Sequence, residues 1–600
     1  MGFRIRVAGW CSLGFALLAT SPSSASSQSD HHAVDVVWSV GIPMRDGVRL
    51  NAVLYKPMHL TSRVPAIYAK TPYLSDREQF HEWGTYLAEN GYVVAAVDAR
   101  GRGDSEGVFR ALDGDGLDGY DVVEWLAKQP WCDGKVGSFG GSYVGYDQWA
   151  TIKQLPPHLR SAVPTASVGA GVDFPMSRNV FSFYALQWLT YVSGKTLKRN
   201  AFEDTSFWLR GILEFQKKRL PFHEYNKSMG NPAPMFEEWV LHPDFDDYWQ
   251  SKMPGPREYR RIDFPILTIT GHFDGDQFGA FHYYDGHMRD GTASARARHY
   301  LVVGPWDHAG TRKPVKEAGG RSFSENSVVD MKKLHKEWYD WTLKGLPKPK
   351  FLKDRVTYYA MGADEWRSAP TVQAVTQQVR KLYLGSRDGQ PIEEFESGTL
   401  TDQRSSSPAP DRCTFDPTVT PEWLTLSPPK LSEASRWMGD QLVYHTEPFE
   451  EELEVNGSAK LLAWIALDVP DTDIEASLRE IKADGSSLAL GLGAQPMRAR
   501  YRESVEQPKL VVEGELNPYQ FQFGFTAVRL AKGSRIRLTL RAPLAFSRER
   551  NFNRGGVVAD ETEKDARPAH LALYHDVTHP SYLELPIGKR MRAVHVATGP

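Results

Sequence analysis

The sequence predicts an α/β fold with a parallel sheet, followed by an all-β domain. Short apolar runs at 64–70, 91–98, 266–271 and 300–304 alternate with stretches of helical periodicity. That alternation is typical of a parallel sheet whose strands are joined by crossover helices. Beyond Pro347 helical periodicity becomes scarce, strands become short and turns frequent, which favours a β-sandwich or jelly-roll.

The elements can be taken in chain order. Residues 36–56 alternate in the manner of strands around an Asp46-Gly47 turn, and helical patterns cover 77–90, 117–128 and 326–344. Between the two α/β stretches the chain is aromatic-rich and largely helical, so we expect a helical cap inserted over the sheet. The predicted divisions are an export signal at 1–25, a first α/β part at 34–167, the cap at 168–260, a second α/β part at 261–346 and the β-sandwich at 350–600.

Composition limits the classes of protein. A chain of 600 residues with 41% hydrophobic residues is long enough for two to four domains with large cores. The net charge of −3, spread evenly along the chain, gives no basic surface for nucleic acid, so no nucleic-acid partner is expected. The sequence does not set the oligomeric state, and a homo-oligomer is compatible with it.

The N-terminus has the pattern of an export signal. Arg4 and Arg6 precede an apolar run from Val7 to Thr20, and small residues follow, with cleavage expected after Ala25. No later run reaches the roughly 18 apolar residues of a membrane span. We therefore expect an exported protein, periplasmic or secreted, without stable membrane insertion; a buried N-terminal helix is the alternative.

The cysteines exclude a disulfide scaffold and a multi-cysteine zinc site. There are three, Cys11 in the signal segment and the distant Cys132 and Cys413. The last two are either buried free thiols or one interdomain disulfide. No metal site and no cofactor are expected; an Asp-rich stretch at 113–118 lacks the pattern of a calcium loop.

A glycine-rich serine turn stands at residues 136–146, Val-Gly-Ser-Phe-Gly-Gly-Ser-Tyr-Val-Gly-Tyr. It predicts a short strand, a sharp turn at Ser142 and a helix. Such a turn pushes the serine hydroxyl out of the sheet, and the N-terminus of the helix offers free N–H groups to an oxyanion. The common pattern is G-x-S-x-G, whereas here the second glycine comes one place late, at Gly145.

Partners for this serine follow two later strands. Asp274 comes after the strand at 266–270, and His308 after the strand at 300–304. The order Ser142, Asp274, His308 is the one required of a serine hydrolase on a parallel sheet, with His308 as base and Asp274 holding its tautomer. The local alternatives are Asp276 for Asp274 and His272 for His308.

These segments resemble the cocaine esterase, α-amino-acid ester hydrolase and X-Pro dipeptidyl-peptidase (CocE/NonD-type) family of α/β-hydrolases. The late glycine is this family's own form, G-x-S-Y-x-G. The matching segments are Asp98–Gly101, Trp131–Gly137, Gly140–Gly145, Phe273–Gly275, Gly304–His308, Met361–Arg367 and Pro470–Asp473. The resemblance covers nearly all of the chain after the signal.

The resemblance implies an α/β-hydrolase sheet, an inserted helical cap and a C-terminal β jelly-roll domain. It also implies an oxyanion hole made by the backbone N–H after the nucleophile and by a tyrosine hydroxyl. Those roles carry over to Tyr143 and to Tyr73, which follows a sheet strand. The alternative for Tyr73 is an aromatic side chain that only faces the cap.

Substrate recognition is less well defined by the sequence. The amino-ester hydrolases of this family hold a substrate ammonium group with a carboxylate cluster, to which Asp276 and Asp173 would belong here. Gln277 stands where a second carboxylate is expected, and Asp276 is alternatively a loop cap. The cap aromatics Phe181, Phe183, Tyr184 and Trp188 would form an acyl pocket or simply core.

We therefore expect a serine hydrolase that cleaves acyl or α-amino-acid esters, or β-lactam side-chain amides, through an acyl-enzyme. Its partner would be a small-molecule ester or amide. The alternative within enzymes is an X-Pro dipeptidyl peptidase. The alternative of another class is an inactive hydrolase-fold protein with a jelly-roll carbohydrate-binding module.

Overall fold

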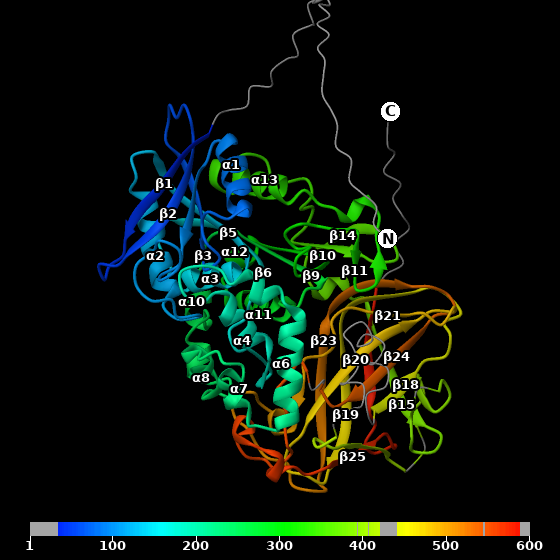
Figure 1. Cartoon of the computed structure of the whole chain (residues 1–600). Coiled ribbons are helices and arrows are strands. Elements are labelled where there is room, and N and C mark those ends of the chain that lie inside the picture. The colour runs from blue at the N-terminus through cyan, green and yellow to red at the C-terminus, as the bar shows by residue number, and fades with distance from the viewer. Residues whose placement is uncertain are drawn as a thin grey trace, which may run out of the picture.

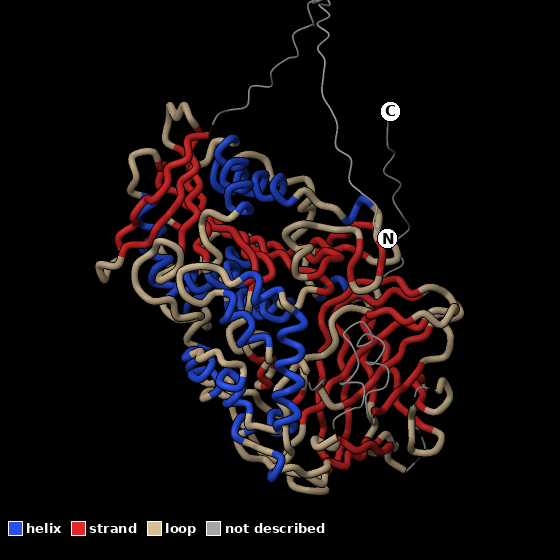
Figure 2. The backbone as a smooth tube through the Cα atoms, in the orientation of Figure 1, coloured by secondary structure: helices blue, strands red, loops and turns tan. Residues whose placement is uncertain are grey.

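The computed structural model describes residues 34–392, 394–405, 407, 409–419, 441–543 and 546–588. The predicted signal peptide at 1–25 and Cys11 lie outside these residues. Two bodies stand out in Figure 1, an α/β body with a layer of helices beside it, and a β-sandwich. Figure 2 shows the same division: helices lie around the strands of the α/β body, whereas the β-sandwich consists mainly of strands. Among the described residues no helix combines the length and apolarity needed to span a bilayer.

A sheet of ten strands forms the centre of the α/β body. Its order is β1-β2-β4-β3-β5-β6-β9-β10-β13-β14. The strands from β4 to β13 in this order run parallel, and β1, β2 and β14 pair antiparallel at the edges. The strands are β1 (Val34–Pro43), β2 (Arg49–Pro57), β3 (Val64–Thr71), β4 (Val93–Asp98), β5 (Cys132–Ser142), β6 (Leu159–Ser167), β9 (Ile266–Phe273), β10 (His299–Asp307), β13 (Val356–Ala360) and β14 (Glu365–Ala369).

Helices cover both faces of this sheet, as a parallel sheet requires. On one face α1 (Glu78–Glu89) and α13 (Met331–Lys344) share a core through Leu87 and Trp338. On the other face α2 (Asp115–Ala127), α3 (Tyr143–Lys153) and α11 (Gln277–Asp290) pack into a second core. Figure 1 shows α1 and α13 side by side at the top of the molecule.

The segment between β6 and β9 is the predicted helical layer. Its buried aromatic side chains, such as Phe215 and Tyr225, pack edge to face and give it a core continuous with that of α2 and α3. It contains α4 (Tyr184–Tyr191), α5 (Arg199–Glu203), α6 (Thr205–Lys218), α7 (Tyr225–Ser228), α8 (Pro234–Val240), α9 (Asp247–Gln250), α10 (Pro256–Tyr259) and the paired short strands β7 (Met176–Ser177) and β8 (Val180–Phe181). Elsewhere lie α12 (Ala293–Arg296) and a small hairpin, β11 (Glu317–Ala318) and β12 (Arg321–Ser322).

Residues 356–369 fall within the predicted C-terminal sandwich, but they form two strands of the hydrolase sheet instead. β13 pairs in parallel with β10, and β14 pairs with β13, so the sheet extends to residue 369 and beyond the predicted boundary at 346. The physical reason is that a short strand has the same local pattern in either sheet, whereas its partner is set by the crossover through α13.

The remaining strands form a β-sandwich with its own core. They are β15 (Gln378–Ser386), β16 (Gly398–Thr401), β17 (Asp411–Phe415), β18 (Gln441–His445), β19 (Leu453–Leu467), β20 (Asp473–Ile481), β21 (Ser487–Ala489), β22 (Met497–Arg498), β23 (Leu516–Leu530), β24 (Arg535–Arg541), β25 (Ala569–Tyr574) and β26 (Tyr582–Ile587). Cys132 in β5 and Cys413 in β17 are both buried and are not joined by a disulfide.

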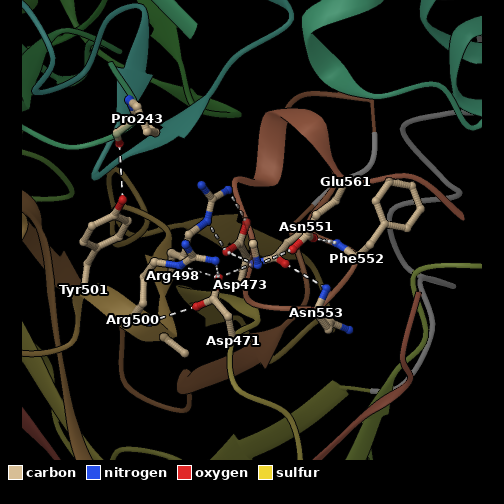
Figure 3. A network of polar contacts seen from close by, with 12 residues as sticks. Pro243, Asp471, Asp473, Arg498, Arg500, Tyr501, Asn551, Phe552, Asn553 and Glu561 are labelled. Atoms are coloured by element: carbon tan, nitrogen blue, oxygen red, sulfur yellow. Dashed lines mark hydrogen bonds and ion pairs between the residues drawn. The ribbon is translucent and has the colours of Figure 1, made fainter. Parts of the chain in front are cut away.

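A buried ionic network joins the sandwich to the helical layer (Figure 3). Arg498 donates to both oxygens of Asp473, at 2.8 and 3.0 Å, and to Glu549 at 2.8 Å. It also donates to the carbonyl of Asn179 in the cap at 2.9 Å. Asp471 accepts from Arg500 at 2.9 Å. The Pro470–Asp473 motif is therefore part of the contact between the domains.

Candidate active site

Ser142 lies at the sharp turn between β5 and α3. It is the last residue of the strand and the N-cap of the helix, with φ 64° and ψ −128°. A non-glycine residue in this conformation is strained, and such strain recurs at nucleophile turns because it pushes the side chain out of the sheet. The predicted strand–serine–helix geometry is therefore present.

Two glycines make this turn and its helix fit. Gly140 has φ +136°, and a Cβ there would lie 2.2 Å from Cγ1 of Val144. A Cβ on Gly145 would lie 2.6 Å from Oγ of Ser167 and 2.8 Å from the carbonyl oxygen of Thr165, both on β6. The late glycine therefore lets α3 cross β6 at close range, which requires the absence of a side chain.

His308 and Asp274 meet beyond the ends of two neighbouring strands. β9 and β10 run parallel in register, and Nδ1 of His308 lies 2.8 Å from Oδ1 of Asp274. Asp274 is fully buried and also accepts from Thr270 Oγ1 at 2.8 Å. Burial would raise the pKa of Asp274, but the hydrogen bonds with His308 and Thr270 hold it below its usual value.

Asp276, the alternative acid, lies further from the imidazole. Its Oδ2 is 3.5 Å from Nδ1 of His308. Burial lowers the pKa of His308, but the charge of Asp276 and the hydrogen bond with Asp274 outweigh it, so the net shift is upward. Burial likewise raises the pKa of Asp276 to about 8, with the positive charge of His308 opposing the shift. Asp276 and His308 together therefore retain a proton to a higher pH than either group would alone.

Tyr73 and Tyr143 stand beside the serine. Tyr73 Oη accepts a hydrogen bond from Nε1 of Trp188 at 3.0 Å, which leaves the phenol hydrogen available to an acceptor. Burial raises the pKa of Tyr73, and polar contacts with Trp188 and Ser142 only partly offset this, so the phenol stays protonated. Tyr143 is the first residue of α3, where a backbone N–H has no acceptor within the helix.

A buried ionic cluster fixes the side chain of Tyr143 away from the serine. Its hydroxyl donates to Oδ2 of Asp115 at 2.6 Å and accepts from the N–H of Leu112 at 2.7 Å. Lys70 pairs with Asp115 at 2.9 Å and with Asp147, on α3, at 2.5 Å. Nothing in the sequence reveals this cluster, because its members are dispersed over three elements. Its position under the elbow helix indicates a supporting role.

Ser142, His308 and Tyr73 line one cavity of about 400 Å³. Helix α4 of the cap contributes Tyr184, Trp188 and Tyr191 to its wall. Of the four aromatic side chains considered for an acyl pocket, Tyr184 and Trp188 therefore line the cavity. Phe181 and Phe183 are each 1% exposed and pack into the core of the cap instead, because they lie just before α4 and face Phe222.

The predicted ammonium-binding carboxylates do not line this cavity. Asp173 accepts the backbone N–H groups of Gly169 and Gly279, so it caps the loop entering the cap and the start of α11. Burial raises its pKa to about 7, opposed by those two hydrogen bonds and reinforced by the charge of Asp274. Asp276 faces His308. The carboxylates influence one another's pKa values, but the structure places neither Asp173 nor Asp276 on the cavity wall.

His272, the alternative base, lies elsewhere. It is fully buried, its Nε2 is 2.8 Å from the carbonyl oxygen of Tyr359, and burial lowers its pKa to about 4. In the described part of the chain, Asp274, Asp276 and His308 are the one group with donor atoms close enough for a metal ion, within 4.8 Å. The hydrogen bond between His308 and Asp274 accounts for that proximity without a metal.

A further polar residue of the site, Arg312, has no signal in the sequence. Arg312 lies one turn beyond His308, at the cavity wall. Its side chain packs on Gly141, where a Cβ would lie 2.8 Å from Cδ of Arg312. No pattern of spacing singles it out, since it follows the last strand-end motif in an irregular turn.

The fold and this constellation define a serine hydrolase of the α/β-hydrolase class. The family model for X-Pro dipeptidyl-peptidase (S15 family) matches residues 46–310, and the model for the X-Pro dipeptidyl-peptidase C-terminal non-catalytic domain matches residues 351–584. The chain thus belongs to this family of serine esterases and peptidases, and the resemblance and fold class expected from the motifs are confirmed.

Individual relatives extend over nearly the whole chain. Cocaine esterase of Rhodococcus sp. (strain MB1 Bresler) is 28% identical over 581 residues, which cover 92% of this chain and 99% of the relative. An aminopeptidase structure from a marine sediment Thaumarchaeota archaeon has a TM-score of 0.76 at 21% identity, covering 95% of this chain and 99% of that one. An α-amino acid ester hydrolase structure also has a TM-score of 0.76, at 20% identity, covering 94% and 98%.

Proposed function

We propose that this protein is an exported serine hydrolase that cleaves a carboxylic ester through an acyl-enzyme at Ser142. The observation that carries the proposal is a single constellation. A serine at a strained turn, a histidine bonded to a buried aspartate and a protonated phenol border one cavity. Each is the group that acyl transfer requires.

In this mechanism Ser142 Oγ attacks the ester carbonyl while His308 removes its proton. Nδ1 of His308 is engaged by Asp274, so Nε2 is the atom that receives the proton. The Tyr73 hydroxyl and the Tyr143 N–H donate to the developing oxyanion. His308 then protonates the leaving group, and a water molecule activated by the same imidazole releases the acid.

Ester hydrolysis is preferred over X-Pro peptidase activity for two reasons. The cocaine esterase relative spans almost the full length of both chains. A dipeptidyl peptidase needs an anionic group to receive the free N-terminus of its peptide, and none of the described residues that line the cavity is Asp or Glu. The same observation weighs against α-amino-acid esters and β-lactam side chains that bear an ammonium group.

The test is hydrolysis of a small p-nitrophenyl ester by the Ser142→Ala variant. We expect kcat to fall by roughly five to six orders of magnitude, with Ser193→Ala, a serine off the cavity wall, as the matched control. Full turnover by Ser142→Ala would refute the nucleophile. Wild-type turnover of Xaa-Pro anilides alone would favour the peptidase, and no turnover of any ester or amide would favour an inactive binding protein.

Export is part of the proposal and is supported by the Arg4, Arg6 and Val7–Thr20 pattern. N-terminal sequencing of the protein recovered outside the cytoplasm should begin at or near Ser26. A cytoplasmic protein that keeps Met1 or Gly2 would refute it.

A further inference from the structure

The cavity around Ser142 is bordered by positive charge. Its wall contains Arg77, Arg312 and Lys313, while Asp and Glu are absent from the described residues that line it. Arg77 donates to the hydroxyl of Tyr191 at 3.2 Å. Lys313 is 73% exposed and lies 3.9 Å from Glu82. Two of these three cations therefore have protein partners or full contact with solvent.

Arg312 is different. Its Nη1 is buried and has no hydrogen-bond partner, and among the described residues no carboxylate forms an ion pair with its guanidinium. Two buried arginines, Arg367 and Arg498, are by contrast paired with carboxylates, Arg367 with Glu454 at 2.7 Å and Arg498 with Asp473 at 2.8 Å. A guanidinium nitrogen cut off from water without an acceptor is costly, so this arrangement requires a reason.

The position of Arg312 supplies the reason. Its stem packs on Gly141, next to the nucleophile, so close that a Cβ at that glycine would lie 2.9 Å from Nη1. Burial is the largest influence on the pKa values of Tyr73, Asp276 and His308, and the positive charge of Arg312 acts on all three. Arg312 thus lies within electrostatic reach of the whole constellation. A guanidinium is the group best suited to bind a carboxylate with two parallel hydrogen bonds.

We infer that Arg312 is a specificity-determining residue and that the substrate is an ester or amide bearing a carboxylate close to its scissile carbonyl. The inference rests on the proposed function and deepens it. The carboxylate comes either from the acyl part, as in a dicarboxylic acid monoester, or from the leaving group, as in an acylated hydroxy acid. A substrate with an α-ammonium group is disfavoured, because its positive charge would be repelled by that of Arg312.

The experiment compares matched anionic and neutral esters in both positions. For the acyl arm these are p-nitrophenyl hydrogen glutarate and p-nitrophenyl pentanoate. For the leaving-group arm they are 4-acetoxybenzoate and its methyl ester. The measured quantity is the ratio of kcat/KM for the anionic ester to that for the neutral one.

We expect wild type to prefer the anion in one arm, and Arg312→Gln to reduce that ratio by about 10- to 100-fold, as for loss of a charged hydrogen bond. Lys313→Gln, with the same change of charge at an exposed neighbouring site, should reduce it less than about threefold. Arg312→Lys should give an intermediate ratio, which shows that the loss in Arg312→Gln is not a failure to fold. A ratio that Arg312→Gln leaves unchanged in both arms would overturn the inference.

Binding without catalysis separates this inference from the proposed function. Calorimetry on Ser142→Ala should show tighter binding of monomethyl glutarate than of methyl pentanoate, and Ser142→Ala/Arg312→Gln should lose that difference. If Ser142→Ala still hydrolyses esters, the proposed nucleophile is wrong, yet the binding difference still decides the role of Arg312. Equal binding of the two esters would refute that role.

Discussion

Replacing Tyr73 by phenylalanine removes one of the two proposed oxyanion donors without changing the shape of the cavity. The Trp188 N–H already donates to Tyr73 Oη at 3.0 Å, so the phenol's own hydrogen is the part that the oxyanion can use. Loss of one such donor costs about 3 kcal/mol of transition-state stabilisation, or a fall in kcat of about 10²- to 10³-fold. The Tyr143 N–H remains, so activity should be reduced rather than abolished.

The same change predicts a second effect. The Trp188 side chain is 5% exposed, and Tyr73→Phe leaves its N–H without an acceptor, which should destabilise the fold by about 1–3 kcal/mol. The assay is kcat and KM on a p-nitrophenyl ester, together with the midpoint of thermal unfolding. KM should change little, because the donor acts mainly on the transition state.

Tyr191→Phe is the matched control. Tyr191 lines the same cavity, and its ring centroid lies 5.8 Å from that of Tyr73. Its hydroxyl accepts from Arg77 and has no contact with Ser142, so its loss should change kcat less than about fivefold. If both variants lose kcat equally, or if Tyr73→Phe changes KM alone, the oxyanion role is refuted.

Two further predictions concern charge. Asp276→Asn removes the carboxyl group that lies 3.5 Å from His308 and that, when ionised, contributes to the raised pKa of the imidazole, so the pair can no longer share a proton. Because the base must be neutral, the acid limb of the pH profile of kcat/KM should move to lower pH. The control is Asp307→Asn, which changes an exposed acid next to His308 in sequence. An acid limb that does not move in Asp276→Asn would contradict the assignment. Arg498→Met leaves Asp473 and Glu549 buried without their cation, which should destabilise the fold by about 3–5 kcal/mol. The measurement is the midpoint of thermal unfolding, which should fall. An unchanged midpoint would show that the network of Figure 3 does not stabilise the fold.

Much of the architecture could be predicted from local pattern. Apolar runs located the main parallel strands, and the ends of β9 and β10 gave Asp274 and His308. Strand β6 was not recognised, because Pro164 and several small residues dilute its apolar run. β13 and β14 were placed in the wrong sheet, because pairing depends on distant partners.

The chemistry of the site follows from residue types and their order along the chain. The sequence has a serine at a glycine turn, then an aspartate and a histidine at the ends of later strands. In a parallel sheet these strand ends lie at the same edge, so the three side chains come close together. The position of Gly145 is likewise a sequence feature, and its cause is that a Cβ there would lie only 2.6 Å from Oγ of Ser167.

The surroundings of the reacting groups depend on the three-dimensional fold. It separates Asp274, at 2.8 Å from His308, from Asp276 at 3.5 Å. Asp173 is not among the residues that line the cavity, whereas Arg312 is. The reason is physical. Strand ends follow from local periodicity, whereas a cavity wall is assembled from loops and a cap whose side chains are oriented by packing between segments far apart in sequence.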